Sequence, residues 1–151
     1  MRKGLVMFGS LFQSKNQKLV KKWKKEHEQI VVLATKVIGE YSKNNQAAAK
    51  KQLKALNELA VDHLMNEDIE FYRLLKDGKR ADRKTEEAVN EFTRSFKGVK
   101  VPLMNFLTIH SRDEANLDDK FFEEFNELVG VLGKRIAFEE DNLYLRMAAK
   151  E

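Results

Sequence analysis

The stretch VDHLMNEDIEFYRLL, residues 61–75, is the most informative part of the sequence for the fold. Its apolar residues recur at the spacing of an amphipathic helix, and His63 and Glu67 lie four residues apart on the same stripe. Both side chains are costly to bury, and a helix that needed only an apolar core would carry Leu or Ile at these two positions. The stretch therefore predicts a helix whose buried face holds polar groups for a reason other than packing.

The same periodicity continues on both sides of this stretch. We expect four helices joined by short loops, over residues 14–44, 46–76, from 82–85 to about 112, and 116–147. Four amphipathic helices of this length with short connections predict an all-α fold, an up-down-up-down antiparallel four-helix bundle.

Local signals fix the expected helix ends. Ser14 is the expected N-cap of the first helix, and the pair Asn44-Asn45 is its expected stop. In the third helix, Pro102 predicts a kink, and Gly98 is a second candidate for a break.

Length and composition bound the class of protein. The chain has 151 residues, of which 42% are hydrophobic and 34% charged, which is typical of one mostly helical domain. We assign residues 14–151 to this four-helix domain and residues 1–13 to an apolar arm that caps the bundle or mediates a homodimer. The arm is short and interrupted by Gly and Ser, and no stretch reaches the roughly 18 apolar residues of a membrane span, so we expect a cytoplasmic protein without membrane contact.

Several classes of function have no support in the sequence. There are no cysteines, so thiolate metal sites, disulfides and cysteine nucleophiles are excluded. No Gly-rich phosphate loop or serine elbow motif is present, which argues against a nucleophilic enzyme. The first half of the chain is basic and the second acidic, but no aromatic residues alternate with the lysines, so we expect no nucleic-acid partner.

A set of polar residues follows the buried stripes of three helices. Counted at 1.5 Å rise per residue in antiparallel helices, they fall at nearly one level. We call them the polar layer: His27, His63, Glu67, Arg135 and Glu139. Trp23 and Tyr72 are expected to pack around this layer and to keep water from it.

Buried carboxylates need a compensating charge, and the sequence offers two. A metal ion would be held by His27, His63, Glu67 and Glu139, since imidazole and carboxylate at i and i+4 approach one ion from one helical face. In the other interpretation, Arg135 pairs with the two carboxylates and the histidines complete a metal-free polar network. The residues alone leave both interpretations open.

Three segments resemble the hemerythrin-like, or HHE cation-binding, domain family. HLMNEDIEFYRLL is similar to the signature of its second helix, with a histidine, a carboxylate four residues later and an aromatic residue, here Tyr72, near the end. KKWKKEHEQIVVLATKVI, which contains His27, resembles the first helix, and LGKRIAFEEDNLYLRM resembles the fourth.

This resemblance implies a non-heme iron site inside a four-helix bundle, with His27, His63, Glu67 and Glu139 as ligands. It also implies an oxygen- or metal-responsive binding or sensing role, with dioxygen as a ligand, rather than that of a turnover enzyme. Arg135 stands where the family has a histidine, so a depleted or mononuclear site is expected. Another divalent metal in place of iron, and oxidase or peroxidase chemistry, are further interpretations.

A second family resembles the chain at other positions. Proteins of the regulator of sigma D family share a pattern similar to KLVKKW, to Val61-Asp62 followed by Tyr72, and to LGKR followed by an acidic pair. That resemblance implies a metal-free bacterial regulator that binds the main sigma factor of RNA polymerase, with an arginine at the position of Arg135.

Overall fold

The computed structural model describes residues 14–76 and 83–149, and every regular element within these residues is helical. The elements in chain order are α2 (Lys15–Ser42), α3 (Gln46–Lys76), α4 (Arg83–Phe96), α5 (Lys100–His110), α6 (Asp119–Phe138), the π-helical segment η1 (Glu139–Leu143) and α7 (Tyr144–Ala149). The predicted all-α class is confirmed. The apolar arm, residues 1–13, lies outside the described residues.

The first helix has the ends that the sequence predicts, and the second begins at Gln46 as expected, whereas its expected stop at Asp77-Gly78 lies outside the described residues. The Ser14 hydroxyl accepts a hydrogen bond from the Gln17 backbone N–H, and the Gln17 side chain accepts one from the Ser14 N–H, which completes a capping box. At the other end of α2, Asn44 has a φ of 61°, a left-handed conformation that asparagine tolerates. The Asn45 side chain then accepts from the Ala48 N–H and caps α3.

The third predicted helix is divided into α4 and α5, and the break lies at Gly98 rather than at Pro102. Gly98 has a φ of 80°, which favours glycine. Pro102 lies in the first turn of α5, where a missing N–H breaks no hydrogen bond within the helix, so no kink is needed there. The fourth helix begins at Asp119 instead of near Asn116, because the Asp118 side chain accepts from the Phe121 N–H and caps it.

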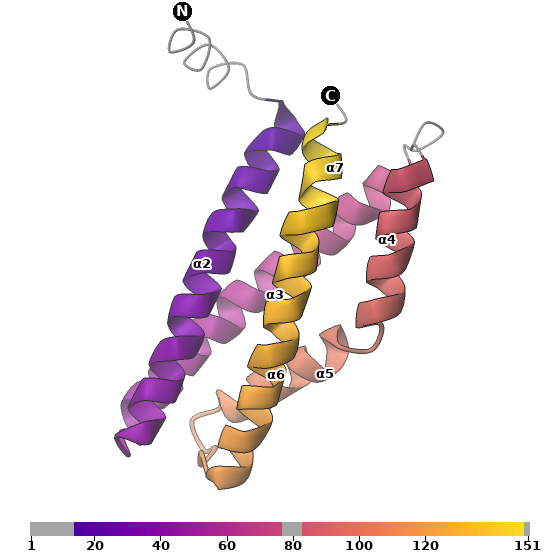
Figure 1. Ribbon diagram of the computed structural model, residues 1–151. Helices are drawn as coiled ribbons and strands as arrows, with labels where there is room; N and C mark the ends of the chain where they lie inside the picture. Colours follow the sequence, from indigo (N-terminus) through magenta and orange to yellow (C-terminus); the bar gives the residue numbers. More distant parts are fainter. Residues whose placement is uncertain (1–13, 77–82, 150–151) are drawn as a thin grey trace, which may run out of the picture.

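Figure 1 shows α2 and α3 crossing in opposite directions, with α6, η1 and α7 forming one continuous rod beside α2. Helix α3 also packs against α4 and α5, and α4 packs against η1. Each of the long helices therefore contributes one face to a shared interior. Within the described residues, no helix is long and apolar enough to cross a membrane.

The interior consists of two apolar clusters separated by the polar layer. The larger cluster includes Ile30, Leu56 and Phe125, and the smaller one includes Trp23, Phe71 and Met147. Along α2, His27 lies between Trp23 of the smaller cluster and Ile30 of the larger, and along α3, Glu67 lies between Leu64 of the larger and Phe71 of the smaller. All five members of the polar layer are buried, as the helical periodicity predicts.

Candidate metal centre

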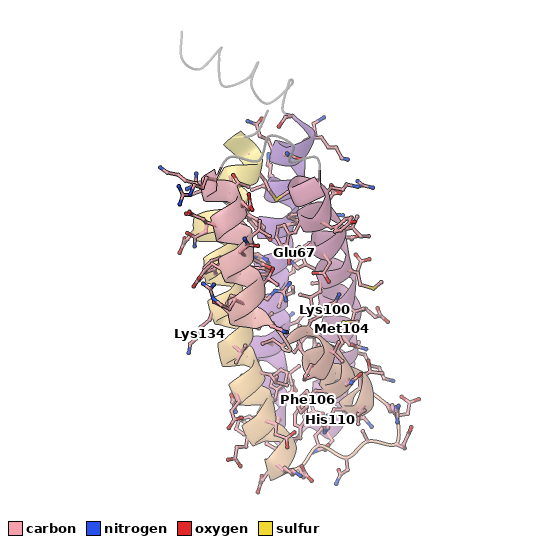
Figure 2. All side chains as sticks on the ribbon, turned by 90° about the vertical axis from the view of Figure 1, so that its right-hand side faces the viewer. Glu67, Lys100, Met104, Phe106, His110 and Lys134 are labelled. Carbon is pink, nitrogen blue, oxygen red and sulfur yellow. The ribbon has the colours of Figure 1, made fainter. Side chains whose placement is uncertain are left out.

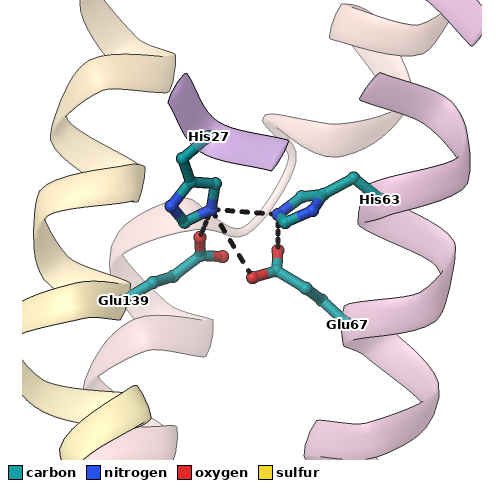
Figure 3. A group of neighbouring side chains, drawn as sticks. All are labelled: His27, His63, Glu67 and Glu139. Carbon is teal, nitrogen blue, oxygen red and sulfur yellow. Dashed lines mark hydrogen bonds and ion pairs between the residues drawn. The ribbon is translucent and has the colours of Figure 1, made fainter. Parts of the chain in front are cut away.

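The two histidines and two glutamates of the polar layer converge on one point (Figure 3). His27 comes from α2, His63 and Glu67 come from α3, and Glu139 opens η1. Each offers one nitrogen or oxygen atom, and these four atoms lie within 4.8 Å of one another. No member of this group, the His/Glu cluster, exposes more than 2% of its surface. The prediction that these residues meet at one level is confirmed.

The spacing of the four donor atoms suits ligands of a single ion. His27 Nε2 lies 2.9 Å from His63 Nε2 and 3.1 Å from Glu139 Oε1, and His63 Nε2 lies 3.2 Å from Glu67 Oε1. Neighbouring ligands on an octahedral ion with bonds of about 2.1 Å are about 3.0 Å apart. These three contacts match that spacing.

Two further carboxylates orient the imidazoles. His27 Nδ1 donates to Glu140 Oε2 and His63 Nδ1 donates to Glu26 Oε1, each over 2.7 Å. A carboxylate can only accept, so each Nδ1 carries a proton, and each Nε2 faces the cluster, with a lone pair in the neutral ring and with a second proton in the imidazolium. Histidine ligands of metals are commonly held by a carboxylate in this way.

This orientation leaves the two Nε2 atoms facing each other 2.9 Å apart. Two lone pairs repel at that distance, so the pair needs a cation between or beside the nitrogens, either a proton or a metal ion. Glu67 Oε1, which is buried, lies 3.2 Å from His63 Nε2 and receives a hydrogen bond only when that nitrogen carries a proton. A metal ion would take the place of that proton and satisfy the oxygen together with the imidazoles.

Arg135 forms ion pairs with both carboxylates of the cluster and a hydrogen bond with one. Its Nε donates to Glu139 Oε2 over 3.1 Å, and its Nη2 lies 3.7 Å from Glu67 Oε1 without a hydrogen bond. The guanidinium also lies over the Phe92 ring of α4, 4.9 Å from the ring centroid, in a cation–π contact. The ion pairs expected of Arg135 in the metal-free interpretation are thus both present, with a hydrogen bond at Glu139 and a longer contact at Glu67.

The imidazoles hold protons more tightly than free histidine. Burial lowers the pKa of His27, but hydrogen bonds to Glu139 and Glu140 outweigh burial and raise the pKa above the usual 6.5. Burial also lowers the pKa of His63, and the hydrogen bond and negative charge of Glu67 raise it overall. The negative cluster therefore attracts positive charge at neutral pH.

The two carboxylates of the cluster differ in their affinity for a proton. Burial and the charge of Glu67 together raise the pKa of Glu139 to about 7. Burial also raises the pKa of Glu67, but the hydrogen bond and charge of His63 outweigh it and leave the pKa lowered. Metal ligands must lose their protons before they bind, so a metal would displace the proton from Glu139 near neutral pH.

Of the two aromatic residues expected around the polar layer, only Trp23 lies there. Trp23 is 0% exposed and meets the His63 ring edge-on at 6.2 Å between ring centroids. Tyr72 is 63% exposed, so its predicted place beside the site is wrong. Tyr72 lies five positions after Glu67, which turns it off the buried stripe of an α-helix, and Phe71 occupies the inward position instead.

Sequence reasoning missed three residues that contact the cluster: Glu26, Glu140 and Tyr144. Glu26 is three residues after Trp23 and four before Ile30, so its spacing on α2 already indicates the inward face. The α-helical period puts Glu140 on the surface, but η1 turns it toward His27, to which it is hydrogen bonded. The Tyr144 hydroxyl donates to Glu67 Oε2 and lies 3.0 Å from His27 Nε2.

Neither His110 nor helix α4 contributes a ligand to the cluster. The buried side chains of α4 are Thr85, Val89 and Phe92, so its inward face offers neither imidazole nor carboxylate. His110 donates from Nδ1 to the Phe106 carbonyl oxygen and lies well away from Glu67 (Figure 2).

Comparison with known proteins assigns no family, so the interpretation of the site rests on the contacts described above. The chain matches no family model, no curated protein and no solved structure.

Proposed function

We propose that this chain is a hemerythrin-like metal-binding protein that holds one iron ion through His27, His63, Glu67 and Glu139. Its role is an oxygen- or metal-responsive binding or sensing function. The observation that carries the proposal is the pair of Nε2 atoms 2.9 Å apart, each on an imidazole whose Nδ1 is already bonded to a carboxylate. Such a pair is arranged for a shared cation.

The arrangement of the helices supports the bundle that this family implies. In Figure 1, α2, α3, α4–α5 and α6–α7 follow one another with alternating direction. We propose that they form the up-down-up-down four-helix bundle of hemerythrin-like proteins, with its metal ligands projecting inward from three of the four rods.

The donor set and its charges favour one ion. Imidazole together with carboxylate suits iron, zinc and related divalent metals, and the family resemblance selects iron among them. Arg135 supplies a permanent positive charge beside Glu139, where a second cation would otherwise stand. Since the inward face of α4 adds no ligand, a second ion would lack donors on that side.

Burial of the donors favours binding over turnover. Glu67 is 0% exposed and His27 and His63 are each 2% exposed, so a substrate of ordinary size has no direct access to the donor atoms. A small diatomic molecule such as dioxygen is the kind of ligand that reaches a buried metal through local motion of the side chains. This supports a sensing or binding role.

Elemental analysis of protein purified from iron-supplemented cells tests the proposal. The wild type should carry one iron per chain, and His63→Ala should carry none while keeping its helical circular dichroism. His110→Ala is the matched control, since His110 lies outside the cluster, and it should retain the metal. Wild-type protein without stoichiometric metal would rule out the proposed function.

A second candidate function is a metal-free regulator that binds a sigma factor, and two observations favour it. Arg135 already neutralises Glu139 without a metal. Met65, Ile69 and Tyr72 are more than half exposed and recur at i, i+4 and i+7, which gives α3 an apolar outer face suited to a protein partner. Calorimetric titration with a purified main sigma factor tests this candidate. Binding that is independent of metal and lost in Ile69→Glu would support it, whereas no binding would remove it.

A further inference from the structure

A fifth donor atom lies inside the His/Glu cluster, and it belongs to Tyr144. The Tyr144 hydroxyl donates a hydrogen bond to Glu67 Oε2. The same oxygen lies 3.0 Å from His27 Nε2 and 3.5 Å from Glu139 Oε1. Tyr144 is 1% exposed, so these side chains, and not water, are its partners.

The π-helical segment brings Tyr144 to this position. The Tyr144 backbone N–H donates to the Glu139 carbonyl oxygen five residues earlier, which is the hydrogen bond of a π-turn. In an α-helix, two residues five apart point in different directions, whereas here Glu139 and Tyr144 both face the cluster. Such bulges within α-helices occur frequently at functional sites.

Packing holds the phenol ring in place. The Tyr144 ring stacks on the His27 ring with centroids 5.5 Å apart and an angle of 15° between the planes, and Trp23 covers it at 5.5 Å. The ring therefore cannot turn its hydroxyl away from the cluster without disturbing two buried neighbours.

The hydroxyl has one proton and three close polar neighbours. It donates that proton to Glu67 Oε2 at the shortest contact, and His27 Nε2 and Glu139 Oε1 lie farther from the same oxygen. A phenylalanine would fill the same apolar space without adding an oxygen to this crowded group of polar atoms. The presence of the oxygen is explained if it joins the other donors in holding a cation.

We propose that Tyr144 is a further ligand of the iron site and binds ferric iron through its phenolate oxygen. This rests on the proposed function, and it adds a ligand that distinguishes the two oxidation states. Tyrosinate is an established ligand of iron in proteins, and a negatively charged oxygen favours the more highly charged ion. In binding, the Tyr144 O–H bond breaks, an oxygen–iron bond forms and one proton leaves to the solvent, with no electron transferred.

Coordination by Tyr144 has an optical consequence that the other four ligands do not share. A phenolate bound to ferric iron gives a charge-transfer band in visible light, and resonance Raman excitation in that band enhances the vibrations of the phenolate ring. Zn²⁺, with its filled d shell, gives no such band and serves as the colourless control.

The test loads metal-free protein with Fe³⁺ supplied as its citrate complex and records iron content, visible absorption and resonance Raman spectra. The chain has three tyrosines, so each is replaced in turn. The wild type, Tyr41→Phe and Tyr72→Phe should show the band and the ring vibrations. Tyr144→Phe should retain iron and lose both.

The outcomes separate this proposal from the proposed function. Iron-loaded wild type without the band, or a band that persists in Tyr144→Phe, overturns the assignment of Tyr144 and leaves the iron site intact. Wild type that takes up no iron overturns both. If circular dichroism shows that Tyr144→Phe does not fold, the other two variants take its place as evidence. In that case, a band that the wild type shows and that Tyr41→Phe and Tyr72→Phe both keep supports the assignment.

Discussion

Replacing Glu139 by glutamine should stabilise the metal-free protein while it removes a ligand. The substitution keeps the length and shape of the side chain and deletes its charge. Glu139 is 1% exposed and lies beside Glu67, and burial with the charge of Glu67 raises its pKa to about 7. Above that pH the folded metal-free protein carries an unfavourable negative charge, which the glutamine side chain of the variant would lack.

The size of the effect follows from the pKa. The carboxyl of Glu139 has a pKa of 4.5 in the unfolded chain and about 7 in the fold. Between these values the folded state binds more protons than the unfolded state, so the free energy of unfolding falls as pH rises. At about 1.4 kcal/mol for each pH unit, the wild type loses about 3 kcal/mol across this window. Glu139→Gln escapes that loss, so its advantage should appear at about pH 8 and be absent at about pH 5.

Urea unfolding of chelator-treated protein measures this difference. Trp23, the single tryptophan, is buried against the His63 ring and reports local unfolding by fluorescence, and circular dichroism reports the helices. Glu123→Gln, an exposed position on α6, is the matched control and should change little at either pH. Equal stability of Glu139→Gln and wild type at about pH 8, or a gain of the same size at about pH 5, would refute the reasoning.

Further predictions concern the partners of the cluster. Arg135→Met should lower the free energy of unfolding of metal-free protein by up to about 3 kcal/mol at about pH 9 and by much less at about pH 6, because it leaves Glu139 buried without its cation. A carboxyl with a pKa of about 7 escapes that cost by taking a proton at the lower pH, and urea denaturation at both pH values measures the difference. Glu26→Gln and Glu140→Gln should each weaken metal affinity roughly 10- to 100-fold, measured by competition with a chelator, with the number of bound ions unchanged. Adding metal at about 100 times its dissociation constant should stabilise the wild type by about 2.7 kcal/mol and leave Glu139→Gln nearly unaffected. Metal affinity should fall as pH drops below about 7, since His27 and Glu139 then keep their protons, and calorimetry in two buffers should show proton release on binding.

Much of the candidate site follows from the sequence because it depends on helical repetition. His63 and Glu67 lie one turn apart on any α-helix, and the rise per residue sets His27 and Glu139 at the same height in neighbouring antiparallel helices. Burial of these residues needs only their place on the apolar stripe. The cap at Ser14 is equally local, since it depends on one side chain and a backbone N–H three residues away.

The rest depends on deviations from that repetition. A π-helical segment shifts the register after Glu139, so a count at α-helical period cannot bring Tyr144 to the site. The position of Tyr72 near the end of α3 suggests a place at the site, although the period of α3 turns it outward. In the expected third helix, a kink at Pro102 is not needed because proline breaks no hydrogen bond in the first turn of a helix. The break lies instead at Gly98, which adopts a φ open chiefly to glycine.

The proposal that the polar layer is built around one cation is tested most directly by anaerobic calorimetric titration of Fe²⁺ into chelator-treated wild-type protein. We predict saturable binding that ends at one ion per chain and disappears in His63→Ala. A titration of correctly folded wild type that gives no saturable binding, or that is unchanged in His63→Ala, would contradict it.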